Sequence, residues 1–577
     1  MLRKVFIQTS QNLWTLSPQM KRSSEQTIRA LARKQRVIIN PLLFIALYIL
    51  ALIFTRFWNV ENTARFTRDE SYDIVKLHQY WIEKKITLVG AIDYTGSLVY
   101  SSLTYYTMMP FAVIGNFEPV SPVYAFSVVG LIAVFFIYLI TKQIERDCFS
   151  LDFSKDRNDK RKTASFDKTK VGLTMILALV WFPLVQASRW SWNPYFLPFS
   201  MAIAIYLFLK GVPAQTLLSP ESYSFASKGR LYGVGALQNR IYLILSGLIF
   251  GAAFHYHYIS FVSTVSFLFL YGLYDFIKKL KLRKTKEIAT SLKLLAMTIA
   301  DNSVAYVFAG FALMILPFVI FDLRHPPGLF FTGYLGNNLV SQGFGDKLTK
   351  VLTTAPQIIF KMGIFLSGNK LFSLILILLV SIISYLDFKK KNIVAFIFLA
   401  PVVFQILIIS FLPAQETRYF LPALIFFLVW ILVKRQVTSD RLAKSVIFLM
   451  IVGNIFVLPH TLLTESKPSP KVVGGVSNYI VAKIHSDDLK NINIAVLASP
   501  DPDPLGAVYR DVLLSKEIRV LPTNQFDLTD NLFIISTSDE ETVRRDSANV
   551  INDFRSGKMS EYYELSDSDW VVYLFNK

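Results

Sequence analysis

Long apolar runs alternate with short polar segments along most of this 577-residue chain. A stretch of about 20 apolar residues is long enough for a helix to cross a bilayer. By that length the pattern predicts eleven membrane-spanning helices, near 37–55, 121–141, 171–187, 195–209, 241–257, 259–276, 304–321, 371–386, 393–411, 419–433 and 445–459. The chain is therefore expected to be an α-helical polytopic membrane protein.

The composition agrees with that pattern, because 53% of the residues are hydrophobic and only 18% are charged. Soluble domains carry about 25% charged residues. The net charge of +19 comes from Lys and Arg that gather in short segments between apolar runs. This placement indicates membrane topology and contact with anionic lipid rather than nucleic-acid binding. The single cysteine, Cys148, excludes an intrachain disulfide and a cysteine-based metal site.

A twelfth apolar stretch, 97–115, carries no charge, and its topology depends on the basic loops elsewhere. If it crossed, five loops with 27 Lys and Arg would lie outside, whereas the opposite loops after residue 120 hold only 7. Those five loops are 142–170, 210–240, 277–303, 387–392 and 434–444. Because basic loops stay in the cytoplasm, we expect 97–115 to lie at the outer interface or dip into the bilayer.

The resulting map divides the chain into three parts. A basic cytoplasmic segment, 1–36, precedes a transmembrane domain, 37–460, with long outer loops at 56–120 and 322–370. The remaining region, 461–577, is expected to be extracytoplasmic. Its apolar runs "NIAVLAS", "NLFIIST" and "VVYLF", with the helix-like "PLGAVYRDVLLSK" between the first two, predict a small α/β domain.

The first outer loop contains a carboxylate-rich stretch, "RDESYDIVKLHQYWIEKK". Its apolar residues recur at helical spacing and predict an amphipathic helix on the membrane surface: Ile74, Leu77, Trp81 and Ile82. Asp69 and Glu70 fall at the start of this helix. Two interpretations stay open: Asp69 is a helix cap with Glu70 as a solvated neighbour, or the pair includes a general base. Asp73 is assigned to the solvated face.

Basic and imidazole side chains occur at the ends of other outer segments: Arg189, His255, His257, Arg324, His325 and Arg418. Singly, each has a structural explanation, as an interfacial anchor, an aromatic-belt residue or a surface ion pair. Together with a carboxylate they suit a reaction on a phosphate-bearing lipid, because Arg binds phosphate and His donates to it. A metal site is less supported, since the two histidines at 255 and 257 are spaced i, i+2.

These segments resemble the GT-C class of integral-membrane glycosyltransferases, in particular family 39, which includes protein O-mannosyltransferases and aminoarabinose lipid A transferases. The resemblance covers roughly 37–460. It rests on "RDE" in the first outer loop, "GSLVYSSLTYYTMMP" before the second span, "ASRWSWNPYFLPF" before the fourth and "RYFLPALIFF" in the penultimate span.

The resemblance implies transfer of a sugar, with inversion, from a polyprenyl-phosphate-linked donor to a protein, lipid or glycan acceptor. Asp69 matches the catalytic base, with Glu70 in support. Arg324, His325 and Arg418 are assigned to the donor phosphate by position, beside His255, His257 and Arg189 as further substrate-binding candidates.

Two departures from the family bear on the cofactor. The usual "PPL" reads "GSL" here, and Asn193 stands where several relatives carry an acidic residue. A divalent metal is therefore not supported, and no cofactor is expected.

The alternative functions are a flippase for lipid-linked saccharides and a membrane scaffold. A flippase is expected to place ionisable residues midway along its spans and to contain repeats, which this sequence lacks.

Overall fold

The computed structural model of the chain describes residues 42–84, 86–92, 99–155, 167–212, 234–283, 303–325, 344–412, 415–434, 437–501, 503–546, 548, 554, 558–566 and 568–576. The predicted basic segment 1–36 lies outside these residues. Residues Met1–Thr55 and Arg56–Lys577 form two compact units, and the fold described below is that of the second.

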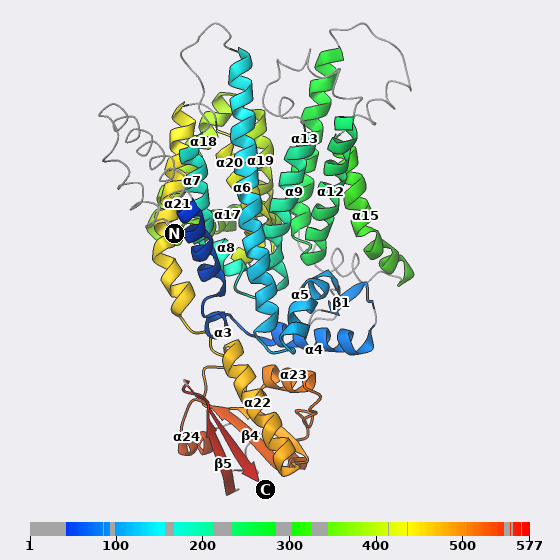
Figure 1. Cartoon of the computed structure of the whole chain (residues 1–577), viewed down its shortest axis with the longest axis vertical. Coiled ribbons are helices and arrows are strands. Elements are labelled where there is room, and N and C mark those ends of the chain that lie inside the picture. The colour runs from blue at the N-terminus through cyan, green and yellow to red at the C-terminus, as the bar shows by residue number, and fades with distance from the viewer. Residues whose placement is uncertain are drawn as a thin grey trace, which may run out of the picture. The chain divides into compact units, whose positions relative to one another are not determined.

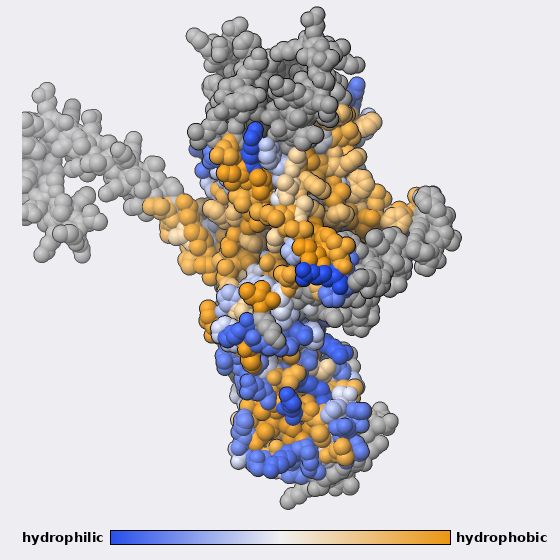
Figure 2. Space-filling view, turned by 90° about the vertical axis from the view of Figure 1, so that its right-hand side faces the viewer, coloured by the Kyte–Doolittle hydropathy of each residue, from blue (hydrophilic) through white to orange (hydrophobic). Residues whose placement is uncertain are grey.

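Helices make up most of the second unit (Figure 1). The longer ones are α6 (Ser121–Lys155), α9 (Leu197–Gly211), α12 (Val234–Tyr256), α13 (Ser260–Arg283), α15 (Ser303–Arg324), α17 (Phe344–Ser367), α18 (Lys370–Lys389), α19 (Ile393–Phe411) and α21 (Val437–Leu463). Apolar surface covers these helices, and the C-terminal domain is mostly hydrophilic outside (Figure 2). Gly247 and Gly310 let α12 and α15 pack closely, since an added Cβ at Gly247 would lie 1.9 Å from the Val307 carbonyl oxygen.

Among the described residues, nine helices are long and apolar enough to cross a membrane, whereas the sequence predicted eleven. The predicted span 171–187 is broken at Trp181 into α7 (Lys168–Val180) and α8 (Phe182–Ala187). Pro183 lacks the N–H that a continuous helix needs there. The Arg56 guanidinium instead donates to the Ala178 and Leu179 carbonyls, each at 2.7 Å, so the break leaves neither carbonyl unsatisfied.

The predicted span 419–433 is also shorter than expected. It consists of a 3₁₀ helix, η3 (Thr417–Ala423), followed by α20 (Leu424–Leu432). All nine residues of α20 are buried within the protein. A second 3₁₀ helix, η2 (Asn193–Phe196), leads into α9 in the same way.

The predicted first outer loop folds into α3 (Val60–Thr63), α4 (Arg68–Glu83), an antiparallel pair of strands and α5 (Leu103–Ile114). The strands are β1 (Val89–Ile92) and β2 (Val99–Ser101). The twelve residues of α5 span about 18 Å, which is well short of the ~30 Å hydrocarbon core. This helix is therefore not among those long enough to cross a membrane, and the placement of 97–115 at the outer interface stays a prediction.

The C-terminal region is a small α/β domain, as predicted. Its helices are α22 (Pro470–Asp487), α23 (Ala507–Ser515), η4 (Phe526–Leu528) and α24 (Glu540–Arg544), and its strands are β3 (Ile492–Val496), β4 (Asn531–Ser536), β5 (Lys558–Glu564) and β6 (Val571–Asn576). The sheet order is β3-β4-β6-β5, with only β3 and β4 parallel. The sequence pattern identified β3, β4, β6 and α23, and it missed α22 and the polar edge strand β5.

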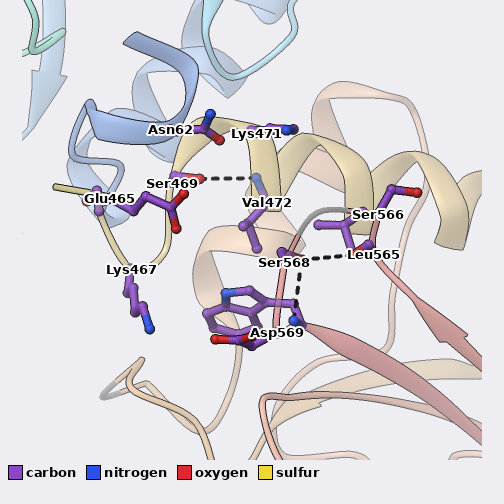
Figure 3. Close-up of a pocket in the computed structure, with 12 residues that line it drawn as sticks. Asn62, Glu465, Lys467, Ser469, Lys471, Val472, Leu565, Ser566, Ser568 and Asp569 are labelled. Atoms are coloured by element: carbon purple, nitrogen blue, oxygen red, sulfur yellow. Dashed lines mark hydrogen bonds between the residues drawn. The ribbon is translucent and has the colours of Figure 1, made fainter. Parts of the chain in front are cut away.

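A linker joins α21 to α22 and is fixed against α3. The Ser466 N–H donates to the Asn62 carbonyl oxygen at 2.9 Å. Figure 3 shows the polar cleft beside this linker, where Ser469 accepts the Val472 N–H at the start of α22. The C-terminal domain is thus tied to the segment that precedes α4.

Candidate functional site

The start of α4 is fixed by a capping box. Thr67 is the N-cap, and its N–H donates to Glu70 Oε2 at 2.7 Å while its hydroxyl binds the same carboxylate. Trp190 Nε1–H donates to Glu70 Oε1, also at 2.7 Å. The interpretation of Asp69 as the cap with Glu70 solvated is therefore wrong, because Thr67 caps the helix and Glu70 is only 2% exposed.

Three carboxylates lie within the first two turns of α4, in different environments. Asp69 is exposed at the second helical position. Burial raises the pKa of Glu70, and the hydrogen bonds from Thr67 and Trp190 oppose this shift. Burial also holds the pKa of Asp73 well above its usual range, although Tyr105 donates a hydrogen bond to it at 2.7 Å. The assignment of Asp73 to a solvated face is thus wrong, since it points toward α5.

Beside these carboxylates lies an aromatic cluster, which we define as Arg65, Trp190, Trp192, Tyr195 and Arg418. The ring centroids of Trp190 and Trp192 are 5.3 Å apart and nearly parallel, and Tyr195 lies 5.1 Å from Trp190. Arg65 stacks over Trp190 at 5.1 Å, and Arg418 stacks over Trp192 at 3.6 Å. The two guanidinium groups therefore flank a pair of tryptophans whose first member binds Glu70.

Arg418 has no ionic partner among the residues that the structure describes. Its Nε is buried and makes no hydrogen bond to any of them. Trp192 and Tyr419 cover it with aromatic rings instead. A half-buried cation without an ion pair among the described residues is costly in a protein, so this guanidinium can receive an anionic ligand.

His257 lies against the same group. It is 5% exposed, accepts the Ile259 N–H at Nδ1 (3.2 Å), and its ring centroid is 5.7 Å from that of Tyr419. Burial, reinforced by the positive charge of Arg418, lowers the pKa of His257 to about 3. The imidazole is therefore neutral at physiological pH, and it adds no charge to the site.

Other predicted site residues have structural contacts. His255 bonds the Ser101 hydroxyl and the Met314 carbonyl, each at 2.7 Å, so both its ring nitrogens are engaged. Arg189 donates to Thr63 Oγ1 at 2.5 Å, and burial lowers its pKa to about 10. Both side chains connect segments that lie next to the aromatic cluster.

Arg324 and His325 are exposed at the end of α15. His325 Nδ1 lies 2.8 Å from the Phe321 carbonyl oxygen. In the described part of the chain no contact joins either residue to the aromatic cluster, and the segment 326–343 that follows them lies outside it. Their assignment to a donor phosphate stays a prediction.

Sequence reasoning missed the tryptophans, Tyr195, Arg65 and the Asp73–Tyr105 bond. One signal was present, since "RWSWNPY" places two Trp residues and a Tyr within six positions of the chain. Aromatic residues of this kind also mark membrane interfaces, so the pattern alone does not distinguish the two roles. No group of three or more His, Cys, Asp or Glu converges as a metal site within the described ranges.

The assembled site has two sides. On one side α4 presents an exposed carboxylate, Asp69, beside a buried one, Glu70. On the other, η3 presents the Arg418 guanidinium, which forms no ion pair with the residues that the structure describes. Aromatic faces separate them and Tyr195 lies within electrostatic reach of both Glu70 and Arg418. This arrangement can hold an anion at one end and accept a proton at the other.

No protein-family model and no curated protein matches the sequence. Among solved structures, the chain is similar to ArnT from Cupriavidus metallidurans bound to undecaprenyl phosphate, with 10% identity, 92% of this chain and 97% of that chain covered, and a TM-score of 0.46. The apo form of that ArnT gives 10% identity, 94% and 98% coverage, and a TM-score of 0.45.

The apo oligosaccharyltransferase of Archaeoglobus fulgidus is also similar, with 11% identity, 84% of this chain and 57% of that chain covered, and a TM-score of 0.36. At identities and scores of this size, the chemistry of the present chain has to be inferred from its own residues.

Proposed function

We propose that this protein is a GT-C-like membrane glycosyltransferase that moves a sugar from a polyprenyl-phosphate-linked donor to an acceptor at the outer face of the membrane. The observation that carries the proposal is the position of the Arg418 guanidinium. It stacks on Trp192 and has no anionic partner among the described residues. Trp192 stacks in turn on Trp190, which donates a hydrogen bond to Glu70 of α4.

The guanidinium is suited to the phosphate of the donor. Its planar fork of N–H donors matches phosphate oxygens, and in a partly buried site each such bond is charge-assisted. As the bond between the sugar and the phosphate breaks, negative charge develops on the phosphate oxygen. Arg418 stabilises that charge, and the neutral His257 beside it keeps the local field from becoming more positive.

Asp69 is the general base in this proposal. An acceptor hydroxyl or amine attacks the anomeric carbon, and the new bond forms on the face opposite the phosphate. The carbon–oxygen bond to the phosphate breaks, the electron pair leaves with the polyprenyl phosphate, and the acceptor's proton moves to Asp69. A single displacement of this kind inverts the anomeric carbon. Glu70 holds the turn that carries Asp69 by binding Thr67 and Trp190.

The test is sugar transfer by the purified chain in lipid with a panel of polyprenyl-phosphate sugars, scored by release of polyprenyl phosphate in the presence of lipid or peptide acceptors. Undecaprenyl phosphate is the lipid to try first, because it is the one bound by the similar ArnT. Asp69→Asn should fold but lose about 10³-fold or more of the rate, which corresponds to roughly 4 kcal/mol of barrier. Glu70→Gln, which keeps most of the capping contacts, should retain partial activity.

The matched control is Asp487→Asn, which alters an exposed carboxylate of the C-terminal domain. It should transfer sugar at the wild-type rate. If Asp69→Asn also transfers at that rate, the assignment of the base is wrong. If no polyprenyl-phosphate sugar is consumed by the wild-type chain, the proposed donor class is wrong.

A further inference from the structure

The C-terminal α/β domain contacts the helix that carries the candidate base. We propose that this domain is a positioning element for α4, acting through the contact of Asp511 on α23 with Ser71 on α4. The catalytic part of this inference rests on the proposed function, and the structural part does not.

The helices α23 and α4 pack side by side, and a buried polar contact joins them. The Ser71 hydroxyl lies 2.8 Å from Asp511 Oδ2 and 3.0 Å from the Arg68 carbonyl oxygen. Ser71 donates to Asp511, and the Arg68 carbonyl is a second acceptor within reach of the same proton. Burial raises the pKa of Asp511, and the hydrogen bond from Ser71 opposes this shift. Ser71 follows Glu70 directly in the chain, so the contact acts on the turn that carries Asp69.

The C-terminal domain makes a second contact, with the turn between α5 and α6. Lys516, just after α23, forms an ion pair with Glu118 at 2.8 Å, and Asn478 of α22 donates to the same carboxylate at 3.3 Å. Glu118 lies in the turn between α5 and α6. Further along α4, His78 stacks edge-on against Phe117 with ring centroids 4.9 Å apart. The domain therefore contacts both α4 and the turn on which α4 packs.

The expected consequence follows from how α4 is held. Its inner side packs on α5 and the aromatic cluster, and its other side packs on α23. If α23 is loosened, the first turn of α4 can shift relative to Arg418, which belongs to η3. A shift of about 1 Å at a reacting group can lower a rate by roughly 10²-fold. Donor binding through Arg418 should be unaffected, so the change should fall on kcat and not on KM for the donor.

The experiment uses the full chain in lipid nanodiscs, with hydrogen exchange of the α4 amides and steady-state transfer kinetics. Asp511→Ala should speed exchange in α4 by about 10-fold, corresponding to the loss of one partly buried side-chain hydrogen bond, and lower kcat with unchanged donor KM. Asp511→Asn should behave like wild type, since the amide oxygen can still accept from the Ser71 hydroxyl. Asp487→Ala, an exposed change in the same domain, is the control.

Unchanged exchange in α4 of Asp511→Ala would overturn the proposal, as would faster exchange with an unchanged kcat. If Asp511→Ala also loosens α12, and is thus globally destabilised, Ser71→Ala serves in its place and must show the same local effect on α4. The exchange measurement needs no activity. A wild-type chain that transfers no sugar would therefore remove the proposed function and its kcat effect, while the docking of α23 on α4 would still be decided.

Discussion

Two groups of cations lie toward opposite ends of the helices, and they differ in how their charge is balanced. In the group that we call the ion-pair cluster, Lys170 lies 2.7 Å from Asp440 and 3.2 Å from Glu145, and Lys434 pairs with Asp387. These residues come from three segments predicted to be basic cytoplasmic loops or their ends. Every one of these lysines therefore has at least one carboxylate partner.

The aromatic cluster is different, since Arg418 has aromatic rings in place of carboxylates. The two sites are well separated. The Ser127 hydroxyl of α6 donates at 2.9 Å to the carbonyl of Ser188, two residues before Trp190. Glu145 lies 18 residues further along α6, which is about 27 Å of helix. A buried cation with a carboxylate partner is part of the structure. Under the proposed function, Arg418, which forms no ion pair among the described residues, instead binds an anion from outside.

The largest effect should come from breaking the ion-pair cluster. Lys434→Ala leaves the buried Asp387 carboxylate without a cation, held only by neutral donors, the Trp430 indole N–H (3.2 Å) and the Asn392 amide (3.3 Å), among the described residues. It should cost about 3–5 kcal/mol of stability. Thermal unfolding in lipid measures this. The double variant Lys434→Met with Asp387→Leu should unfold near the wild-type temperature, because no uncompensated charge remains. Equal stability of Lys434→Ala and wild type would contradict the structural role.

A smaller effect, and of another kind, should follow from Arg418→Ala. Donor affinity should fall about 10–100-fold, or roughly 1.4–2.8 kcal/mol, while thermal unfolding stays at the wild-type temperature. Titration of a polyprenyl-phosphate sugar into the chain in nanodiscs measures the affinity. Arg324→Ala, the predicted second phosphate ligand, is the comparison and should show a smaller loss. Destabilisation by Arg418→Ala with unchanged donor affinity would reverse the contrast between the two clusters.

The smallest effect concerns the buried acid Asp73. Because burial raises its pKa in the folded state, the folded chain retains a proton that the unfolded chain releases near pH 4, and stability falls as the pH rises through the folded pKa. Asp73→Asn removes this loss and can still accept from Tyr105. Its unfolding temperature should exceed that of wild type at pH 8, and the difference should disappear below about pH 4.

Asp488→Asn is the control for this pH series. The Asp488 side chain is 89% exposed, so its difference from wild type should stay flat with pH. A flat difference for Asp73→Asn as well would show that its carboxyl is not held protonated by the fold.

The apolar runs predicted most of the helices because their lengths are set by hydrophobic thickness, which any sequence window shows. The apolar runs at 171–187 and 419–433 wrongly predicted continuous membrane-spanning helices. The first is broken by Pro183 and repaired by Arg56, which is distant in sequence, and the second is buried in protein, so that its length is not set by lipid. Tertiary contacts of this kind leave no local signal.

The candidate site was predicted in part. The pattern placed Glu70 and Asp69 at a helix start, and the structure confirms that position. It could not show that Glu70 is buried, because the burial comes from Trp190, 120 residues away. The same limit applies to Arg418. It matters because no carboxylate pairs with it among the described residues, and the residue type alone cannot show how its surroundings pack.

The buried helix α20 follows directly from the 3₁₀ turn that contains Arg418. A helix exposed to lipid tilts or slides when the bilayer becomes thicker or thinner, whereas one enclosed by other helices is held by them. The guanidinium is therefore anchored at a depth defined by the protein, so membranes of different thickness would leave its position relative to the surrounding helices unchanged.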